Sequence, residues 1–253
     1  MITLTSDFGS PYPASMKGVM LQRTDARLVD VAHDLPRQDV RSAAFWLREV
    51  LPYFPPATHL VVVDPGVGTD RAAVVVRAGE HLLVGPDNGV LLPVARLLAA
   101  DADEGPQVFE WRYENPESST FHGRDVFAPS AAAVHDAGVE GFTDLDPVAP
   151  TDDYVDLFFP EPDVRSDGAD GEVLVVDDFG NAITNVPGEV LDGRAEVAVN
   201  RERAPVEPAY AHVDPGQRLV TVGSHGNVEF AVNQGRGDEA FGVDVGDRVS
   251  LSW

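Results

Sequence analysis

The hydrophobic pattern of this 253-residue chain changes once, and that change constrains its fold more than any other feature. Up to about residue 145, short apolar runs at 2–5 and 60–63 alternate with segments of helical periodicity at 14–21, 91–99 and 127–137. The sequence also predicts a β-hairpin, formed by the apolar runs 73–76 and 82–84. Strands that alternate with helices are typical of an α/β layer fold.

After a stretch rich in proline and aspartate, from 147 to 171, the pattern becomes purely β-like. Short runs of strand-forming residues are separated by turn residues, which is typical of a small β-barrel or sandwich. We therefore predict an N-terminal α/β domain over residues 1–165 and a smaller C-terminal all-β barrel domain over residues 166–253. The expected strands of the second domain lie at 173–176, 182–186, 195–199, 218–222, 228–232 and 248–251.

The charge of the chain limits its partners. It carries 42 acidic and 18 basic residues, a formal net charge of -24. Such a surface cannot neutralise phosphates along a duplex, so we expect a small-molecule partner and no nucleic acid. The acidic residues are spread over the whole sequence, and Lys17 is the only lysine. We interpret this pattern as an adaptation to high salt, typical of halophilic organisms, with an ordinary acidic protein as the alternative.

Several familiar kinds of site are missing from the sequence. There are no cysteines, which excludes disulfides and thiolate chemistry. Arg71 occupies the position where a dinucleotide fingerprint beginning at Gly66 would need its third glycine, and no histidine pair has helical zinc-ligand spacing. We expect chemistry without a metal or cofactor. No apolar run approaches the length of a membrane span and no signal segment precedes the first strand, so we expect a cytoplasmic protein with no membrane partner.

The segment 64–71 places a carboxylate and a guanidinium at the exit of a buried strand. Asp64 directly follows the apolar run 60–63, and glycines at 66 and 68 allow a tight turn that returns Arg71 towards Asp64. Open α/β sheets bind ligands at the carboxyl ends of their strands. The two side chains could therefore tune a proton transfer, although a surface turn with an incidental ion pair would show the same pattern.

Other polar segments are candidates of the same kind. Asp7 ends the first strand, where a carboxylate can accept hydrogen bonds from vicinal hydroxyls, although a turn or cap aspartate is the alternative. His122 lies between Phe121 and a glycine in the segment 119–125, in which a histidine could be catalytic or structural. The segments 176–185 and 223–233 carry amide and carboxylate groups that could bind a purine edge or merely form hairpin turns.

Taken together, the motifs SDFG, MKGV, DPGVGTDR, PDNG, FHGRDVFAP, DDFGNAITN and SHGNVEFAVN occur in an order that covers nearly the whole chain. In this order they resemble the S-adenosylmethionine (SAM) hydrolases, also called SAM hydroxide adenosyltransferases, which are relatives of the bacterial fluorinase and chlorinase. The resemblance implies an N-terminal Rossmann-like domain, a C-terminal β-barrel and a homotrimer whose sites lie between neighbouring subunits. It also implies hydrolysis of SAM, in either sulfonium configuration, to adenosine and L-methionine.

The resemblance further implies roles for particular residues. Asp64, Arg71 and His122 would prepare water as the nucleophile, and Asp7 would hold the ribose hydroxyls. Phe121 and Tyr210 would supply apolar and stacking surface. The groups expected to grip the adenine and methionine ends are Asp177, Asn181, Ser224, Glu229 and the backbone near Val232.

The halogenating relatives carry a tyrosine in place of Asp64, a threonine in place of Val67 and a Tyr-Ser pair in place of His122 and Gly123. This chain therefore resembles the hydrolases more than the halide-dependent enzymes, and a non-catalytic protein that binds SAM or adenosine is the third reading. Two features depart from the family pattern. The loop after Asp7 is shorter and lacks a second aspartate, and position 225 is a histidine to which we assign no role.

Overall fold

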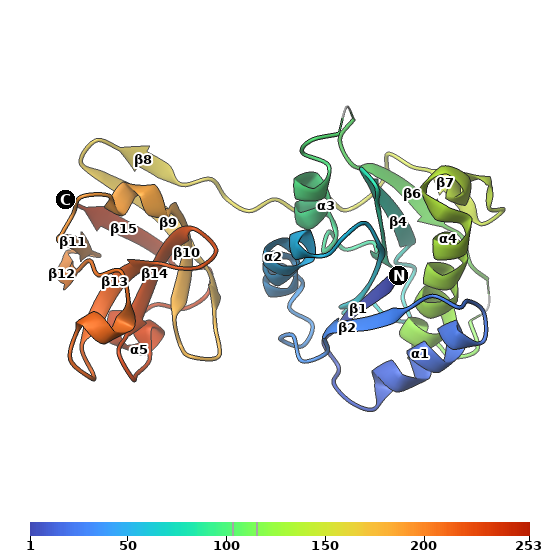
Figure 1. The fold of residues 1–253 in the computed structure, drawn as a ribbon, viewed down its shortest axis with the longest axis horizontal. Helices are drawn as coiled ribbons and strands as arrows, with labels where there is room; N and C mark the ends of the chain where they lie inside the picture. The colour runs from blue at the N-terminus through green and yellow to red at the C-terminus, as the bar shows by residue number, and fades with distance from the viewer. Residues whose placement is uncertain (103, 115) are drawn as a thin grey trace. The chain divides into compact units, whose positions relative to one another are not determined.

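The computed structural model describes residues 1–102, 104–114 and 116–253, which form two compact units, Met1–Phe158 and Phe159–Trp253 (Figure 1). The sequence-based boundary at residue 165 falls at the end of β8 (Asp163–Arg165). This short strand pairs with β9 (Gly168–Val176) of the second unit and therefore belongs to that unit's sheet. Each unit is described by itself below.

The first unit is built on a mixed seven-stranded sheet with the strand order β2-β1-β3-β5-β4-β6-β7. The first four strands of this order are mutually parallel, and the last three run antiparallel to their neighbours. The strands are β1 (Ile2–Ser6), β2 (Leu28–Ala32), β3 (Thr58–Val62), β4 (Ala73–Ala78), β5 (His81–Pro86), β6 (Gln107–Trp111) and β7 (Val148–Pro150).

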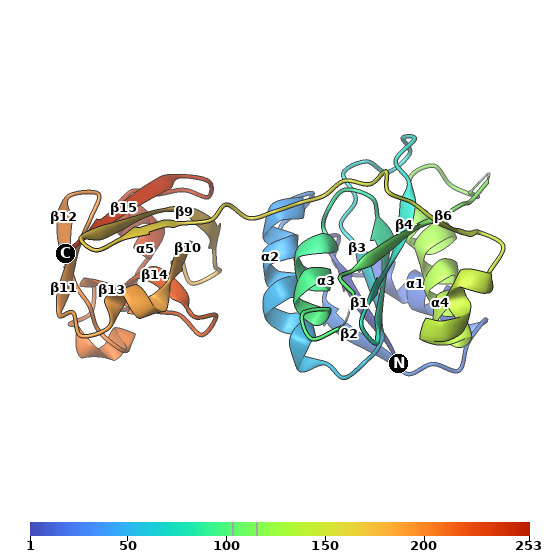
Figure 2. The same cartoon turned by 90° about the horizontal axis from the view of Figure 1, so that it is seen from above.

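Helices cover both faces of this sheet (Figures 1 and 2). One face carries α1 (Tyr12–Leu21) and α4 (Ala128–Gly141), and the other carries α2 (Val40–Val50) and α3 (Leu92–Leu98). The chain passes from β1 through α1 to β2, and then through α2 back to β3 on the other side of β1. The strand order thus reverses between β1 and β3, and such a reversal opens a crevice at the carboxyl ends of the two strands.

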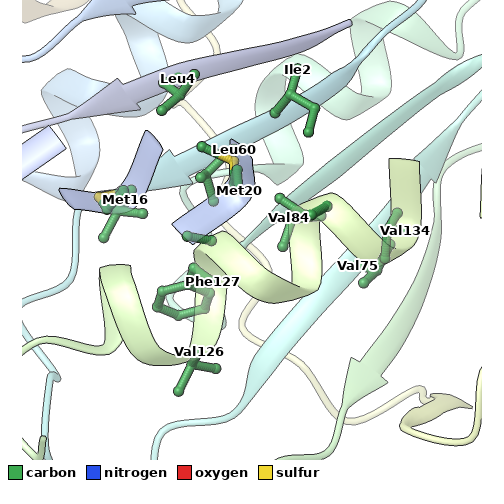
Figure 3. Packing of buried hydrophobic residues seen from close by; sticks show 14 of the residues in the cluster. Ile2, Leu4, Met16, Met20, Leu60, Val75, Val84, Val126, Phe127 and Val134 are labelled. Carbon is green, nitrogen blue, oxygen red and sulfur yellow. The ribbon is translucent and has the colours of Figure 1, made fainter. Parts of the chain in front are cut away.

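The core of the first unit holds β1 by its apolar side chains. Ile2 and Leu4 alternate with threonines along β1, and both apolar side chains are fully buried. They pack in one cluster with Met16 and Met20 of α1 and with side chains of α4 (Figure 3). Burying a large aliphatic side chain stabilises a fold by about 1.5–3 kcal/mol. This packing therefore holds the end of β1, and the residue that follows it, in a defined place.

The second unit is an antiparallel β-structure. Its main path has the order β12-β11-β15-β9-β10-β14-β13. Val206, which follows β12, forms a β-bridge to Val220 of β13, so the two ends of the path approach each other and the sheet is barrel-like. Mixed α/β structure followed by a barrel-like sheet confirms the coarse prediction. The remaining strands are β10 (Ala182–Pro187), β11 (Glu196–Val199), β12 (Glu202–Pro205), β13 (Arg218–Val222), β14 (Asn227–Val232) and β15 (Arg248–Ser252); the unit also contains the short helix α5 (Gly237–Phe241).

Among the residues that the structure describes, no helix combines the length and the apolar character that a membrane crossing requires.

Candidate active site

Asp64 and Arg71 form a buried, two-pronged ion pair just beyond the end of β3. Arg71 donates from Nε to Asp64 Oδ1 at 3.1 Å and from Nη2 to Asp64 Oδ2 at 2.6 Å. Both side chains are less than a tenth exposed. Burial raises the pKa of the Asp64 carboxyl above its ordinary value, an effect that the neighbouring guanidinium opposes. The carboxylate is therefore a better proton acceptor than an exposed aspartate, and its orientation is fixed by the arginine.

His122 joins this pair from the segment that leads into α4. Its Nδ1 lies 3.2 Å from Arg71 Nη2, and a guanidinium nitrogen can only donate, so Nδ1 accepts and carries no proton. Burial, and then the charge of Arg71, lower the pKa of His122. The ring is therefore neutral near pH 7, with its proton on Nε2. The Tyr113 ring packs edge-on against the imidazole at 5.6 Å.

The loop that carries Asp64 and Arg71 packs closely against the backbone of neighbouring segments. Gly68 adopts φ +80°, and a Cβ there would lie only 2.6 Å from the carbonyl oxygen of Ser119. Only glycine fits this position, because the loop lies directly against the segment that carries His122. At the other side, Asn88 donates from Nδ2 to the carbonyl oxygen of Val63 at 2.8 Å. The PDNG motif thus supports the backbone immediately before Asp64.

Asp7 directly follows β1, the strand that pairs in parallel with β3. Ser6 of β1 is in register with Val62 of β3, so Asp7 and Asp64 leave adjacent strand ends. Adjacent strands are about 4.7–4.9 Å apart. Asp7 is buried, and its Oδ2 accepts a hydrogen bond from the backbone N–H of Gln38 at 2.6 Å. A carboxylate accepts several hydrogen bonds, so it can receive further donors from a ligand.

A second polar network flanks Asp7, and sequence analysis missed most of it. Ser6 Oγ contacts His33 Nδ1 at 2.7 Å, and His33 Nε2 contacts Asp30 Oδ1 at 3.0 Å. Lys17, the only lysine, bonds Asp30 Oδ2 at 2.8 Å. The MKGV motif therefore reaches the end of β1 through Asp30 and His33. His33 gave no sequence signal of its own, because only the β1–β2 pairing brings it beside Ser6.

Four of the predicted residues of the second unit lie together. Asp177 accepts from the backbone N–H of Asn181 at 2.8 Å and from its Nδ2 at 3.0 Å. The Asn181 amide also lies 3.5 Å from the Tyr210 hydroxyl, which donates to Glu229 Oε1 at 2.6 Å. Burial and the Glu229 carboxylate raise the pKa of Tyr210. This cluster therefore offers carboxylate and amide oxygens to a ligand, while the tyrosine stays protonated.

The remaining predicted residues of this unit are more widely spread. Ser224 is exposed in the turn before β14, whereas Val232 is the last residue of that strand. His225, to which we assigned no role, places Nε2 3.4 Å from Glu229 Oε2, and its Nδ1 accepts from the backbone N–H of Asn227 at 3.2 Å. The structure thus adds a histidine beside Glu229.

Phe121 directly precedes His122 and belongs to the first unit. The candidate residues therefore divide into a set at the β1 and β3 ends and a set around β10 and β14. Within the described ranges, no group of three or more His, Asp or Glu side chains could hold a metal ion.

Two family models match the chain. The model of the SAM hydroxide adenosyltransferase N-terminal domain matches residues 2–143, and that of the C-terminal domain matches residues 171–250. The chain belongs to the SAM hydroxide adenosyltransferase family.

Several curated proteins match the chain over nearly their full length. It is 39% identical to an (R)-S-adenosyl-L-methionine hydrolase of Salinispora tropica, over 99% of this chain and 97% of that protein. It is 41% identical to a protein of the same description from Thermus thermophilus, over 97% of both chains. Among solved structures, it is similar to an uncharacterized conserved protein from Thermotoga maritima, with a TM-score of 0.82, 33% identity and complete coverage of both chains.

Proposed function

We propose that this chain hydrolyses S-adenosyl-L-methionine, with the R configuration at sulfur, to adenosine and L-methionine. The names of its curated relatives support the substrate and the configuration. The observation that carries the proposal is the buried group of Asp64, Arg71 and His122 at the end of β3, because all three side chains are joined by hydrogen bonds that fix their directions.

The reaction needs this group for one task. As the water oxygen bonds to C5′, the C5′–S bond breaks and its electron pair stays on sulfur, which leaves methionine as a neutral thioether. The sulfonium is already a good leaving group and needs no acid. Water, with a pKa of about 15.7, is a poor nucleophile until a base takes its proton. General-base catalysis of this kind contributes about 10²–10⁴-fold.

Asp64 is the base in this mechanism. Its raised pKa favours proton uptake, and Arg71 holds both of its oxygens in one plane. His122 cannot take the proton at Nδ1 while that atom accepts from Arg71. Its Nε2–H instead donates to the water oxygen and orients a lone pair towards C5′. Placing water and C5′ about 3–3.5 Å apart and in line supplies much of the remaining acceleration.

The other candidate residues bind the substrate. Asp7 accepts from the ribose hydroxyls at the reversal point of the sheet, as expected for a Rossmann-like domain. Asp177, Asn181, Tyr210 and Glu229 bind the adenine and methionine ends. Phe121, Ser224 and Val232 complete the site with apolar surface and backbone contacts. In this proposal the N-terminal domain carries the chemistry and the C-terminal domain carries much of the recognition.

We further propose that the protein acts as a homotrimer in which the two sets of residues meet across subunits, as the family resemblance implies. A C₃ trimer is a closed ring of heterologous contacts and repeats the same shared site three times. Light scattering at high salt should give three times the chain mass. An active monomer would contradict this part of the proposal.

Chromatographic analysis of the products tests the activity. Each sulfonium diastereomer is incubated with the protein at high salt, with and without added halide. We expect adenosine and methionine in equal amounts, faster from the R form and independent of halide. Halogenated adenosine would instead indicate halide-dependent adenosyl transfer. Tight binding of SAM without any product would indicate the non-catalytic binding protein.

A further inference from the structure

Three aromatic rings meet beside the candidate active site. The ring centroids of Tyr12 and Phe121 are 5.4 Å apart, and the Phe8 ring lies 6.0 Å from each of them. The planes of every pair are close to perpendicular, at 81–89°. Tyr12 remains 53% exposed. The cluster therefore presents aromatic surface to solvent instead of closing it off in the core.

The chain places this cluster beside the reacting groups. Phe8 directly follows Asp7, and Phe121 directly precedes His122. Gly123 packs closely against the Phe121 ring and the Met16 side chain. A Cβ on Gly123 would lie 3.1 Å from that ring and 3.2 Å from the Met16 sulfur. Tyr12 is the first residue of α1. By the family resemblance, Ser10, Pro11 and Tyr12 stand in the short loop in place of a second aspartate.

The arrangement suits a compact cation better than a flat base. Two parallel ring faces can sandwich a flat purine, whereas these rings are mutually perpendicular and offer no such slot. The negative faces of aromatic rings attract cations within about 6 Å of the centroid. One such contact already exists, since the Arg124 guanidinium lies 5.5 Å from the Phe121 centroid. Arg124 is itself paired with Asp125, at 2.5 and 2.9 Å, which reduces its repulsion of a second cation.

We propose that Phe8, Tyr12 and Phe121 recognise the sulfonium centre of the substrate, and that Tyr12 determines the preference for a sulfonium over a neutral thioether. This inference rests on the proposed function. The sulfonium sulfur is bonded to the carbon that water attacks, and in-line attack places it on the side of C5′ away from the water. Phe8 and Phe121 are the chain neighbours of Asp7 and His122, the residues proposed to hold the ribose and the water.

The chemistry predicts which kinetic parameter depends on Tyr12. The positive charge on sulfur disappears as the C5′–S bond breaks, so attraction between ring and cation is strongest in the ground state. An interaction of this kind lowers KM without raising kcat. It also distinguishes substrate from product, because the released methionine thioether is neutral. Tyr12 is thus a specificity residue and not a catalytic one.

Calorimetry with two ligands of nearly the same shape that differ in charge at sulfur tests the inference. Binding of SAM and of S-adenosylhomocysteine, which lacks only the methyl group and the charge, is measured on the full-length protein carrying Asp64→Asn to prevent turnover. Tyr12→Leu should weaken SAM about fivefold or more and leave S-adenosylhomocysteine and adenosine within about twofold. Tyr12→Phe should retain wild-type affinity, and Tyr12→Lys should weaken SAM further by repulsion.

Tyr53→Leu is the matched control, because Tyr53 is an exposed tyrosine of the same unit outside the site, 86% exposed. With Asp64 intact, Tyr12→Leu should raise KM for SAM and leave kcat within about twofold. Equal loss of affinity for all three ligands would overturn the inference and assign Tyr12 to adenine contact. Unchanged affinity would overturn it as well. If the wild-type protein neither binds nor hydrolyses SAM, the proposed function itself fails.

Discussion

Replacing Arg71 by lysine keeps the positive charge and removes the planar guanidinium that bonds several partners at once. Arg71 donates four hydrogen bonds through three nitrogens: two to Asp64, one to the Ala72 carbonyl oxygen at 2.8 Å and one to His122 Nδ1. A lysine ammonium concentrates its donors on one atom and cannot span these partners. We expect it to keep one contact with Asp64 and to release His122.

The magnitude follows from the bonds that are lost. A hydrogen bond that involves a charged group contributes about 1.5–3 kcal/mol. If about 2–3 kcal/mol of this stabilises the transition state, kcat falls by about 30- to 160-fold. Arg71 is not placed against the substrate's adenine or ribose, so the Kd for SAM should stay within about tenfold. Single-turnover rates and calorimetric affinities measure the two quantities separately.

Arg77→Lys provides the control, because Arg77 lies on β4, the strand that begins two residues after Arg71, and donates from Nε to Gln107 Oε1 at 2.7 Å. Thermal midpoints of both variants check that the fold is intact. Wild-type turnover in Arg71→Lys would refute the claim that the guanidinium fork orients Asp64 and His122. A loss of equal size in Arg77→Lys would show that the effect is general to the sheet.

Three further predictions follow. Asp7→Ala should weaken SAM binding before it affects turnover, because it loses hydrogen bonds to a charged acceptor worth about 1.5–3 kcal/mol each; unchanged affinity by calorimetry would contradict this. Burial and the nearby His81 lower the pKa of His59 to about 3, so the unfolded chain takes up this proton first as the pH falls below about 6.5. Urea unfolding at fixed high salt should therefore show stability falling by up to about 1.4 kcal/mol per pH unit from this group as the pH drops from 6.5 towards 3, with a smaller slope in His59→Gln. The net charge of -24 predicts a lower thermal midpoint when salt falls from molar to millimolar, because the Debye length grows from about 3 Å to more than 10 Å; an unchanged midpoint would mean that the chain is not adapted to salt.

The sequence predicted the elements that bury continuous apolar surface. The apolar run 60–63 and the periodic segment 91–99 correspond to β3 and α3 within two residues. It missed α2, although that helix has a buried apolar face and Asp39 caps it by accepting from the Ser42 N–H at 2.9 Å. It also missed the π-helical turn Gly123–Phe127 after His122, since a local pattern cannot distinguish that turn from the start of α4.

The sequence named the residues of the candidate site and not the contacts between them. Asp64, Arg71 and His122 were named from motifs, and the structure joins them by hydrogen bonds. Which ring nitrogen of His122 carries the proton depends on the position of Arg71 Nη2 beside Nδ1. A sequence does not contain that information. His33 was not assigned because it meets Ser6 only through strand pairing. His225 lies four residues before Glu229, and the turn into β14 brings the two side chains together.

The contact between Gly68 and Ser119 restricts how such a site can be redesigned. The loop that carries Asp64 and Arg71 cannot move without the segment that carries His122, since a single added carbon at position 68 would collide with backbone. A Cβ at Gly123 would lie 3.1 Å from the Phe121 ring and 3.2 Å from the Met16 sulfur, so these two side chains would have to shift. Converting this hydrolase pattern into the halogenase pattern, with a Tyr-Ser pair at 122–123, therefore requires the two segments and their packing partners to be exchanged together. Libraries that vary one loop at a time would sample mostly chains in which the two segments no longer fit.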